Sequence, residues 1–194
     1  MDATTAPRTT ARHLPGEVGV WVFILGDMLV FALFFIAFTY YRSQNVPLYL
    51  ESQRTLNQGF GVLNTMLMLS SSWFVALAMQ AARRHLAAIS TRLFALAWLC
   101  GLGFVVVKVF EYGEKVRAGI TLTTNEFYIY YFTLTGIHLM HVLIGMGVLA
   151  LLWHRVRKPA GADLNFVLLE SGASFWHLVD ILWVVLFALL YLVK

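Results

Sequence analysis

Long apolar runs separated by short polar segments are the main feature of the sequence. Five runs reach the length of about 20 residues that crosses the hydrocarbon core of a bilayer. They cover residues 18–41, 59–82, 93–112, 127–154 and 172–193. Because lipid offers no partner for free backbone N–H and C=O groups, each run is expected to be a helix. The pattern therefore predicts an all-α, polytopic membrane protein with five transmembrane helices.

The residues that precede the first run are polar and show no periodicity. They include Pro7 and Pro15, and we expect residues 1–15 to form a disordered cytoplasmic tail. The first apolar run is too long for a signal peptide, and no small-residue cleavage site follows it. Residues 16–194 are expected to form one five-helix domain.

Composition supports a membrane protein and narrows the chemistry. The chain is 60% hydrophobic and 12% charged, with a mean hydropathy of +0.74, whereas soluble domains are about 45–50% apolar and about 25% charged. Its pI near 9.4 does not indicate nucleic acid, because much of the basic charge lies between the apolar runs. Cys100 is the only cysteine, which excludes an intrachain disulfide and a multi-thiolate metal site.

The basic residues predict an orientation in the membrane. Eight Lys and Arg residues lie in the N-terminal tail and the second and fourth loops, and five lie in the first and third loops and at the C-terminus. The positive-inside rule then places the N-terminus in the cytoplasm and the C-terminus in the periplasm.

Polar residues recur at helical spacing at the start of the last apolar run. Glu170, Ser174, His177 and Asp180 are separated by three or four residues, which places them in one stripe of a helix. An ionisable side chain at membrane depth costs about 2.5–3.5 kcal/mol on insertion scales, so this stripe is expected to face protein or water.

The other apolar runs carry matching polar groups. Asp27 in the first run could form a helix–helix or lipid-headgroup contact, or could act as a proton-exchanging carboxylate. Asn64 in the second run precedes three serines, and this pattern favours close helix packing. Glu111 lies three residues after Lys108, at the spacing of an ion pair within a helix. We also expect close packing at Gly136, Gly145 and Gly147 in the fourth run.

Two histidines lie three residues apart in the fourth run. His138 and His141, together with His177, could ligate copper, zinc or haem iron. No recognised metal-binding spacing is present, so hydrogen bonding between helices is the favoured interpretation and no metal site is predicted. The residues alone therefore indicate a five-helix bundle with a buried polar seam. Its predicted members are Asn64, Glu111, His138, His141, Glu170, Ser174, His177 and Asp180.

Five motifs in order along the chain resemble one protein family. They are LGDMLVFALFF, LNTMLMLSSSW, VFEYGE, TGIHLMHVLIG and ESGASFWHLVDILW. Together they resemble subunit III of the haem-copper oxidase family, the cytochrome c oxidase subunit 3-like proteins. The opening LPGEVGVWVFILGDMLVF is most similar to the short five-helix bacterial branch associated with nitric oxide reductase.

The resemblance implies a fold and roles for several residues. It implies two helix bundles, the first two helices against the last three, with structural phospholipid in the cleft and Asp27 as the cleft carboxylate. It implies that the histidines join helices, and that haem and metal are bound by a larger catalytic subunit and not by this chain.

The implied function is that of a non-catalytic accessory subunit in the bacterial inner membrane. Such a subunit would stabilise the catalytic subunit of a nitric oxide reductase-associated respiratory complex, hold lipid and aid proton supply. Subunit III of a terminal quinol or cytochrome c oxidase is the alternative within the family. A small proton or solute transporter, or a stand-alone haem protein, is the alternative outside it.

Overall fold

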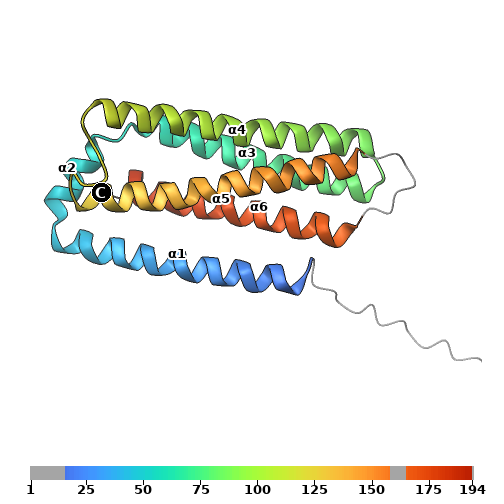
Figure 1. Ribbon diagram of the computed structural model, residues 1–194, viewed down its shortest axis with the longest axis horizontal. Helices are drawn as coiled ribbons and strands as arrows, with labels where there is room; N and C mark the ends of the chain where they lie inside the picture. The colour runs from blue at the N-terminus through green and yellow to red at the C-terminus, as the bar shows by residue number, and fades with distance from the viewer. Residues whose placement is uncertain (1–15, 158–164, 194) are drawn as a thin grey trace, which may run out of the picture.

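The computed structural model describes residues 16–157 and 165–193, and all of its regular structure there is helical (Figure 1). The elements are α1 (Val18–Gln44), α2 (Val46–Arg54), α3 (Gln58–Arg83), α4 (Ala87–Arg117), α5 (Glu126–Val156), α6 (Phe166–Phe187) and the π-helical turn η1 (Ala188–Leu192). Five helices, α1, α3, α4, α5 and α6 with η1, are long and apolar enough to cross a membrane. The predictions of an all-helical fold and five spans are confirmed. The predicted tail, residues 1–15, lies outside the described residues.

Two features of the helices differ from the sequence pattern. Helix α4 extends beyond the expected residues 93–112 at both ends, because the helix continues through charged residues that a hydropathy pattern leaves out. Helix α2 was not expected, since it is short and polar. Pro47 lies in its first turn, where a backbone N–H would have no partner within the helix, so the missing N–H of proline costs nothing.

Asparagines start three of the spanning helices. The side chains of Asn57, Asn125 and Asn165 accept hydrogen bonds from the backbone N–H groups of Gly59, Tyr128 and Leu168. Each bond satisfies one of the donors that the first turn of a helix leaves free. The three caps therefore fix where α3, α5 and α6 begin.

A tight turn joins α3 to α4. His85 adopts a left-handed conformation with φ of 57°, and the N–H of Leu86 donates to the carbonyl of Ala81 at 2.9 Å. This bond closes the end of α3 in the manner of a Schellman motif. The chain reverses within a few residues, so α3 and α4 pack side by side along most of their length.

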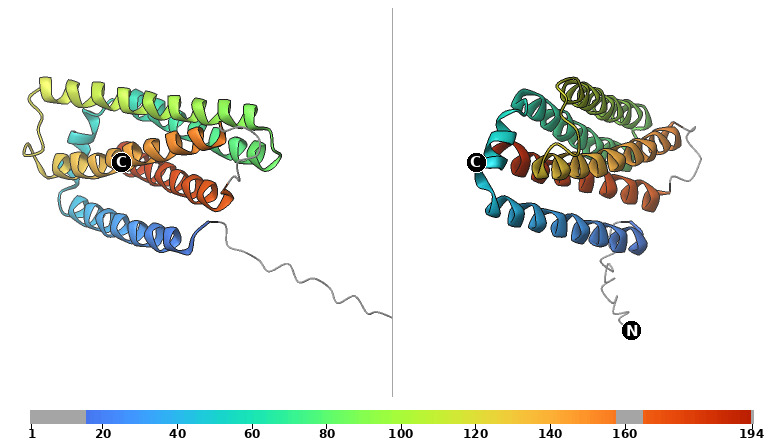
Figure 2. Two further views of the ribbon diagram at one scale, coloured as in Figure 1. Left: turned by 45° about the vertical axis from the view of Figure 1, so that its right-hand side comes forward. Right: turned by 60° about the vertical axis from the view of Figure 1, so that its left-hand side comes forward.

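The spanning helices divide into two groups, but not at the expected boundary. Helix α3 packs against α4 and α6, and α5 packs against α4 and α6, so these four helices form one bundle. Helix α1 lies apart along α5 and α6, as Figures 1 and 2 show. The second span therefore belongs with the last three and not with the first. The reason is the connections: a tight turn ties α3 to α4, whereas α2 separates α3 from α1.

Trp176 of α6 is at the centre of the four-helix bundle and is fully buried. Its ring lies against two glycines: a Cβ added to Gly101 of α4 would lie 3.1 Å from the ring, and one added to Gly145 of α5 would lie 2.7 Å from it. The indole N–H donates to Ser71 Oγ of α3 at 3.1 Å, and Ser71 donates to the carbonyl of Ala97 in α4 at 2.8 Å. One side chain thus joins all four helices of the bundle.

The expectation of close packing at three glycines holds for one of them. Gly145 contacts the Trp176 ring, but a Cβ at Gly136 or Gly147 would meet nothing within 4 Å. Both of these glycines lie on α5 away from the tight contact.

Replacing Gly145 by alanine should destabilise the bundle. The added methyl would overlap the Trp176 ring, and overpacking of this kind costs about 1–3 kcal/mol. The measurement is thermal unfolding in mild detergent. Gly147→Ala is the matched control, since it makes the same backbone change on the same helix without a clash. Equal unfolding temperatures for the two variants would contradict the contact.

Candidate functional site

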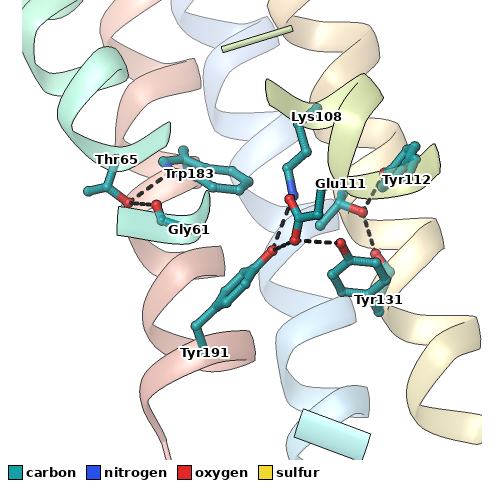
Figure 3. A network of polar contacts seen from close by, with 9 residues as sticks. Gly61, Thr65, Lys108, Glu111, Tyr112, Tyr131, Trp183 and Tyr191 are labelled. Carbon is teal, nitrogen blue, oxygen red and sulfur yellow. Dashed lines mark hydrogen bonds and ion pairs between the residues drawn. The ribbon is translucent and has the colours of Figure 1, made fainter. Parts of the chain in front are cut away.

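A buried polar cluster surrounds Glu111 of α4 (Figure 3). Its carboxylate accepts from Lys108 Nζ at 2.8 Å and from the hydroxyl of Tyr131 at 2.9 Å, and it also accepts from the hydroxyl of Tyr191. Lys108 and Glu111 are fully buried. We call Lys108, Glu111, Tyr131 and Tyr191 the Glu111 cluster.

Aromatic rings enclose the ammonium group of Lys108. Its Nζ lies 4.8 Å from the ring centre of Trp183 and 5.5 Å from that of Tyr131, with the rings of Tyr112 and Tyr191 within 6 Å. Such faces attract a cation electrostatically. The ion pair, the hydroxyl donors and the rings together compensate two charges that would otherwise be very costly at this depth.

The π-helical turn η1 supplies Tyr191 to this cluster. The turn is held by two glutamines: Gln53 of α2 donates to the carbonyl of Leu190 at 3.0 Å, and Gln58 of α3 donates to that of Tyr191 at 3.2 Å. The sequence pattern identified Lys108 and Glu111 but not the two tyrosines. Tyrosines at the end of an apolar run resemble ordinary interface residues, so no signal distinguished them.

Helix α2 covers the same end of the bundle. Thr55, its C-cap, contacts the Tyr128 hydroxyl at 2.6 Å and accepts from Lys115 through its carbonyl, while Ser52 accepts from Asn125 at 2.9 Å. Tyr49 is buried against the rings of α1 and α5, and burial, followed by the nearby Glu126, raises the pKa of Tyr49 to about 12. Tyr49 is therefore neutral at physiological pH.

Asp27 pairs with His141, which links α1 to α5. Asp27 Oδ1 lies 3.1 Å from His141 Nε2, and His141 Nδ1 lies 2.8 Å from the carbonyl of Ile137. Since a carbonyl only accepts, Nδ1 carries the hydrogen. Nε2 then either accepts from a protonated Asp27 or donates to an ionised one, so the two side chains share one proton.

The stripe on α6 runs from the end of the helix into the membrane interior. Glu170 pairs with the exposed Arg83 at 2.9 Å and accepts from the N–H of Gly16 at 3.1 Å, so it lies at the surface end and is not buried. His177 Nδ1 lies 2.6 Å from Ser72 Oγ of α3, and Asp180, three residues further along α6, is buried. Ser174 lies between Glu170 and His177 along α6 and is partly buried.

Asn64 and His138 are fully buried and have no hydrogen-bond partner among residues 16–157 and 165–193. His138 lies between the rings of Phe104 and Trp183, with centroid distances of 5.6 and 5.2 Å. The predicted seam is thus not one continuous network. It consists of the Glu111 cluster, the Asp27–His141 pair, the stripe beside α3, and these two separate residues.

Neither the geometry nor the donor set indicates a metal centre. The described part of the chain contains no group of three or more His, Cys, Asp and Glu side chains positioned to hold a metal ion. His141 and His177 hydrogen-bond to other groups, and His138 is enclosed by rings.

A groove of about 410 Å³ lies between α1 and the bundle. Apolar side chains dominate its lining, among them Val20 and Phe23 of α1, Ile144 and Val148 of α5, and Phe175 of α6. Asp27 is not part of this lining. It lies one turn after Phe23 on α1, and its carboxyl group faces His141. The groove and the carboxylate are neighbouring features and not one site.

Comparison with known proteins places the chain in a family. A family model described as cytochrome c oxidase subunit III matches residues 7–194. The chain belongs to the cytochrome c oxidase subunit III family. The prediction of this family from the five motifs is confirmed, whereas the comparison does not show the nitric oxide reductase-associated branch.

Three relatives illustrate the range of this subunit III family. Subunit 3 of cytochrome c oxidase from Synechocystis is 30% identical over 176 residues, which cover 90% of this chain and 74% of the relative. Subunit 3 of cytochrome bo(3) ubiquinol oxidase from Buchnera aphidicola is 26% identical over 177 residues, or 90% of this chain and 84% of the relative. Subunit 3 of cytochrome c oxidase from Corynebacterium diphtheriae is 28% identical over 201 residues, which cover 100% of this chain and 96% of the relative.

The stability of the folded chain should depend on the balance of charge in the Glu111 cluster. Lys108→Met leaves Glu111 buried without its cation, and breaking a buried pair in this way costs about 3–5 kcal/mol. The double variant Lys108→Met/Glu111→Gln removes both charges but keeps an acceptor for the tyrosines. Thermal unfolding in detergent should show the double variant to be more stable than Lys108→Met alone. A Lys108→Met chain as stable as the wild type would show that the pair is not needed.

Proposed function

We propose that this chain is a non-catalytic accessory subunit of a haem-copper terminal oxidase that oxidises quinol or cytochrome c. The observation that carries this proposal is the family match over nearly the whole chain. Its expected partner is the larger catalytic subunit, which would bind the haem and copper. The relatives named above are subunits 3 of oxidases of both kinds, so either electron donor is compatible with the family.

The buried polar groups support a structural role. The Glu111 cluster joins α4, α5 and η1, the Asp27–His141 pair joins α1 and α5, and the Ser72–His177 contact joins α3 and α6. In lipid, hydrogen bonds between helices are a main source of helix association. Glu111, the Asp27–His141 pair and His177 thus help to hold the helices together.

An oxidase is a better supported partner than nitric oxide reductase. The opening residues of the chain predict the nitric oxide reductase-associated branch, but the three relatives named above are subunits of oxidases. The association with nitric oxide reductase therefore stays a prediction, and the pull-down described below would reveal it.

The groove between α1 and the bundle is the proposed lipid site. Its volume of about 410 Å³ and its apolar lining suit an acyl chain of a phospholipid. We place the chain in a bacterial cytoplasmic membrane with its N-terminus in the cytoplasm, which the distribution of Lys and Arg supports.

A pull-down of the tagged chain from its own membranes in mild detergent tests the proposal. The expected result is a larger co-purifying subunit that carries a haem spectrum, and mass spectrometry of that subunit distinguishes an oxidase from nitric oxide reductase. A colourless chain without a partner would overturn the accessory role. Stoichiometric haem on the isolated chain would overturn the structural role of its histidines.

Asp27→Ala should weaken the attachment of α1 without preventing insertion. The change leaves Nε2 of His141 without its partner, which costs about 1–3 kcal/mol. We expect the purified complex to retain less phospholipid and to lose activity sooner, as measured by lipid analysis and by activity over time. Met28→Ala, a change at the neighbouring exposed residue, is the control. Loss of insertion in Asp27→Ala would show that the pair is required for folding itself.

A further inference from the structure

A second groove, of about 240 Å³, lies between α3 and α6 and has more polar side chains in its lining than the groove beside α1. Five of its eight lining residues have polar side chains: Gln80, Arg83, Glu170, Ser174 and His177. The groove begins at the Arg83–Glu170 ion pair, where the side chain of Arg83 is 59% exposed. It ends about two turns further along α6, at His177.

Polar groups continue behind the inner end of the groove. The His177 ring contacts Ser72 Oγ at 2.6 Å, and Asp180 follows His177 by three residues on α6. Asp180 is only 6% exposed, and its Oδ1 has no hydrogen-bond partner within the described ranges. Buried polar atoms are almost always hydrogen-bonded, so a water molecule is the partner that this oxygen requires.

The energetics favour water over lipid in this groove. Ser174 and His177 are only partly buried, and the part that remains accessible belongs to a surface at membrane depth. Hydrocarbon against these groups would leave them without hydrogen-bond partners, at a cost of several kcal/mol for each group. A volume of about 240 Å³ holds roughly eight water molecules at about 30 Å³ each.

We propose that the α3–α6 groove is a water-filled vestibule that connects His177, and Asp180 behind it, to the aqueous phase at the Arg83–Glu170 end. The vestibule would let these two protonatable groups exchange protons with that side of the membrane. This role does not depend on which respiratory complex the chain joins.

Cysteine accessibility in the assembled complex tests the proposal. Cys100 is the only native cysteine, so a Cys100→Ala background makes each added thiol unique. A charged, membrane-impermeant methanethiosulfonate reagent reacts with thiolates, which form in water and not in hydrocarbon. Arg84→Cys, in the exposed α3–α4 turn, identifies the side of the membrane from which the vestibule should be reached.

Ser174→Cys should react from the same side as Arg84→Cys. Its rate should exceed that of Ile181→Cys, an apolar position on α6 that is 57% exposed on the chain and is expected to face lipid, by at least about ten-fold, because a thiol in hydrocarbon stays protonated. If Ser174→Cys prevents assembly, Ala76→Cys on the facing wall replaces it. Rates as low as that of Ile181→Cys at both positions would show a dry or lipid-filled groove and overturn the proposal.

A pair of histidine positions tests how far the water reaches. His177→Cys lies at the inner end of the vestibule and should react, whereas His138→Cys, enclosed by Phe104 and Trp183, should not. An unreactive His177→Cys beside a reactive Ser174→Cys would overturn the claim that the water reaches His177.

Discussion

The contact of Trp176 with Gly101 and Gly145 is the constraint on which the bundle depends. In a bilayer the hydrophobic effect does not bring helices together, so close packing and hydrogen bonds have to do so. Trp176 provides both: its ring fills the space that two glycines leave on α4 and α5, and its N–H reaches Ser71 on α3. A methyl group at Gly145 would force the ring to shift, and one at Gly101 would require a smaller adjustment.

The polar groups depend on the register of the packed helices. The Glu111 cluster needs residues from α4, α5 and η1 at one depth, and the ends of the helices set that depth through the caps at Asn125 and Asn165. Helix α1 packs on the bundle less extensively than the bundle helices pack on one another, and the Asp27–His141 pair and the bonds from Gly16 and Glu17 to the start of α6 attach it. A firm bundle with one looser helix leaves room for an apolar ligand between them.

Much of this architecture could be predicted from the sequence. The five spans follow from the length of the apolar runs, and the family follows from five motifs, one in each spanning helix. The stripe on α6 was predicted from spacing alone, and its inner members, His177 and Asp180, do face protein. Glu170 belongs to the same stripe but lies at the surface, because spacing gives the face of a helix and not its depth.

Other features depend on contacts between distant parts of the chain. Tyr131 and Tyr191 meet at Glu111 only after α5 and η1 pack against α4, and nothing local marks either tyrosine. The grouping of α3 with the last three spans follows from the left-handed His85 turn. Histidine is enriched at positive φ among non-glycine residues, but the conformation is uncommon even for histidine, so the residue alone does not predict the turn. Pairing of helices in a membrane is thus determined by turns and by small-residue contacts that hydropathy does not report.

A double-mutant cycle between Gly145 and Trp176 tests the central contact most directly. The unfolding free energies of Gly145→Ala, Trp176→Phe and the double variant would be compared with the wild type in detergent. If the alanine methyl meets the indole ring, the smaller phenylalanine ring relieves the overlap. The double variant should then be more stable than the sum of the two single changes predicts, by a coupling energy of about 0.5–3 kcal/mol. Strict additivity of the two changes would contradict the account, because it would show that Trp176 does not occupy the space beside Gly145.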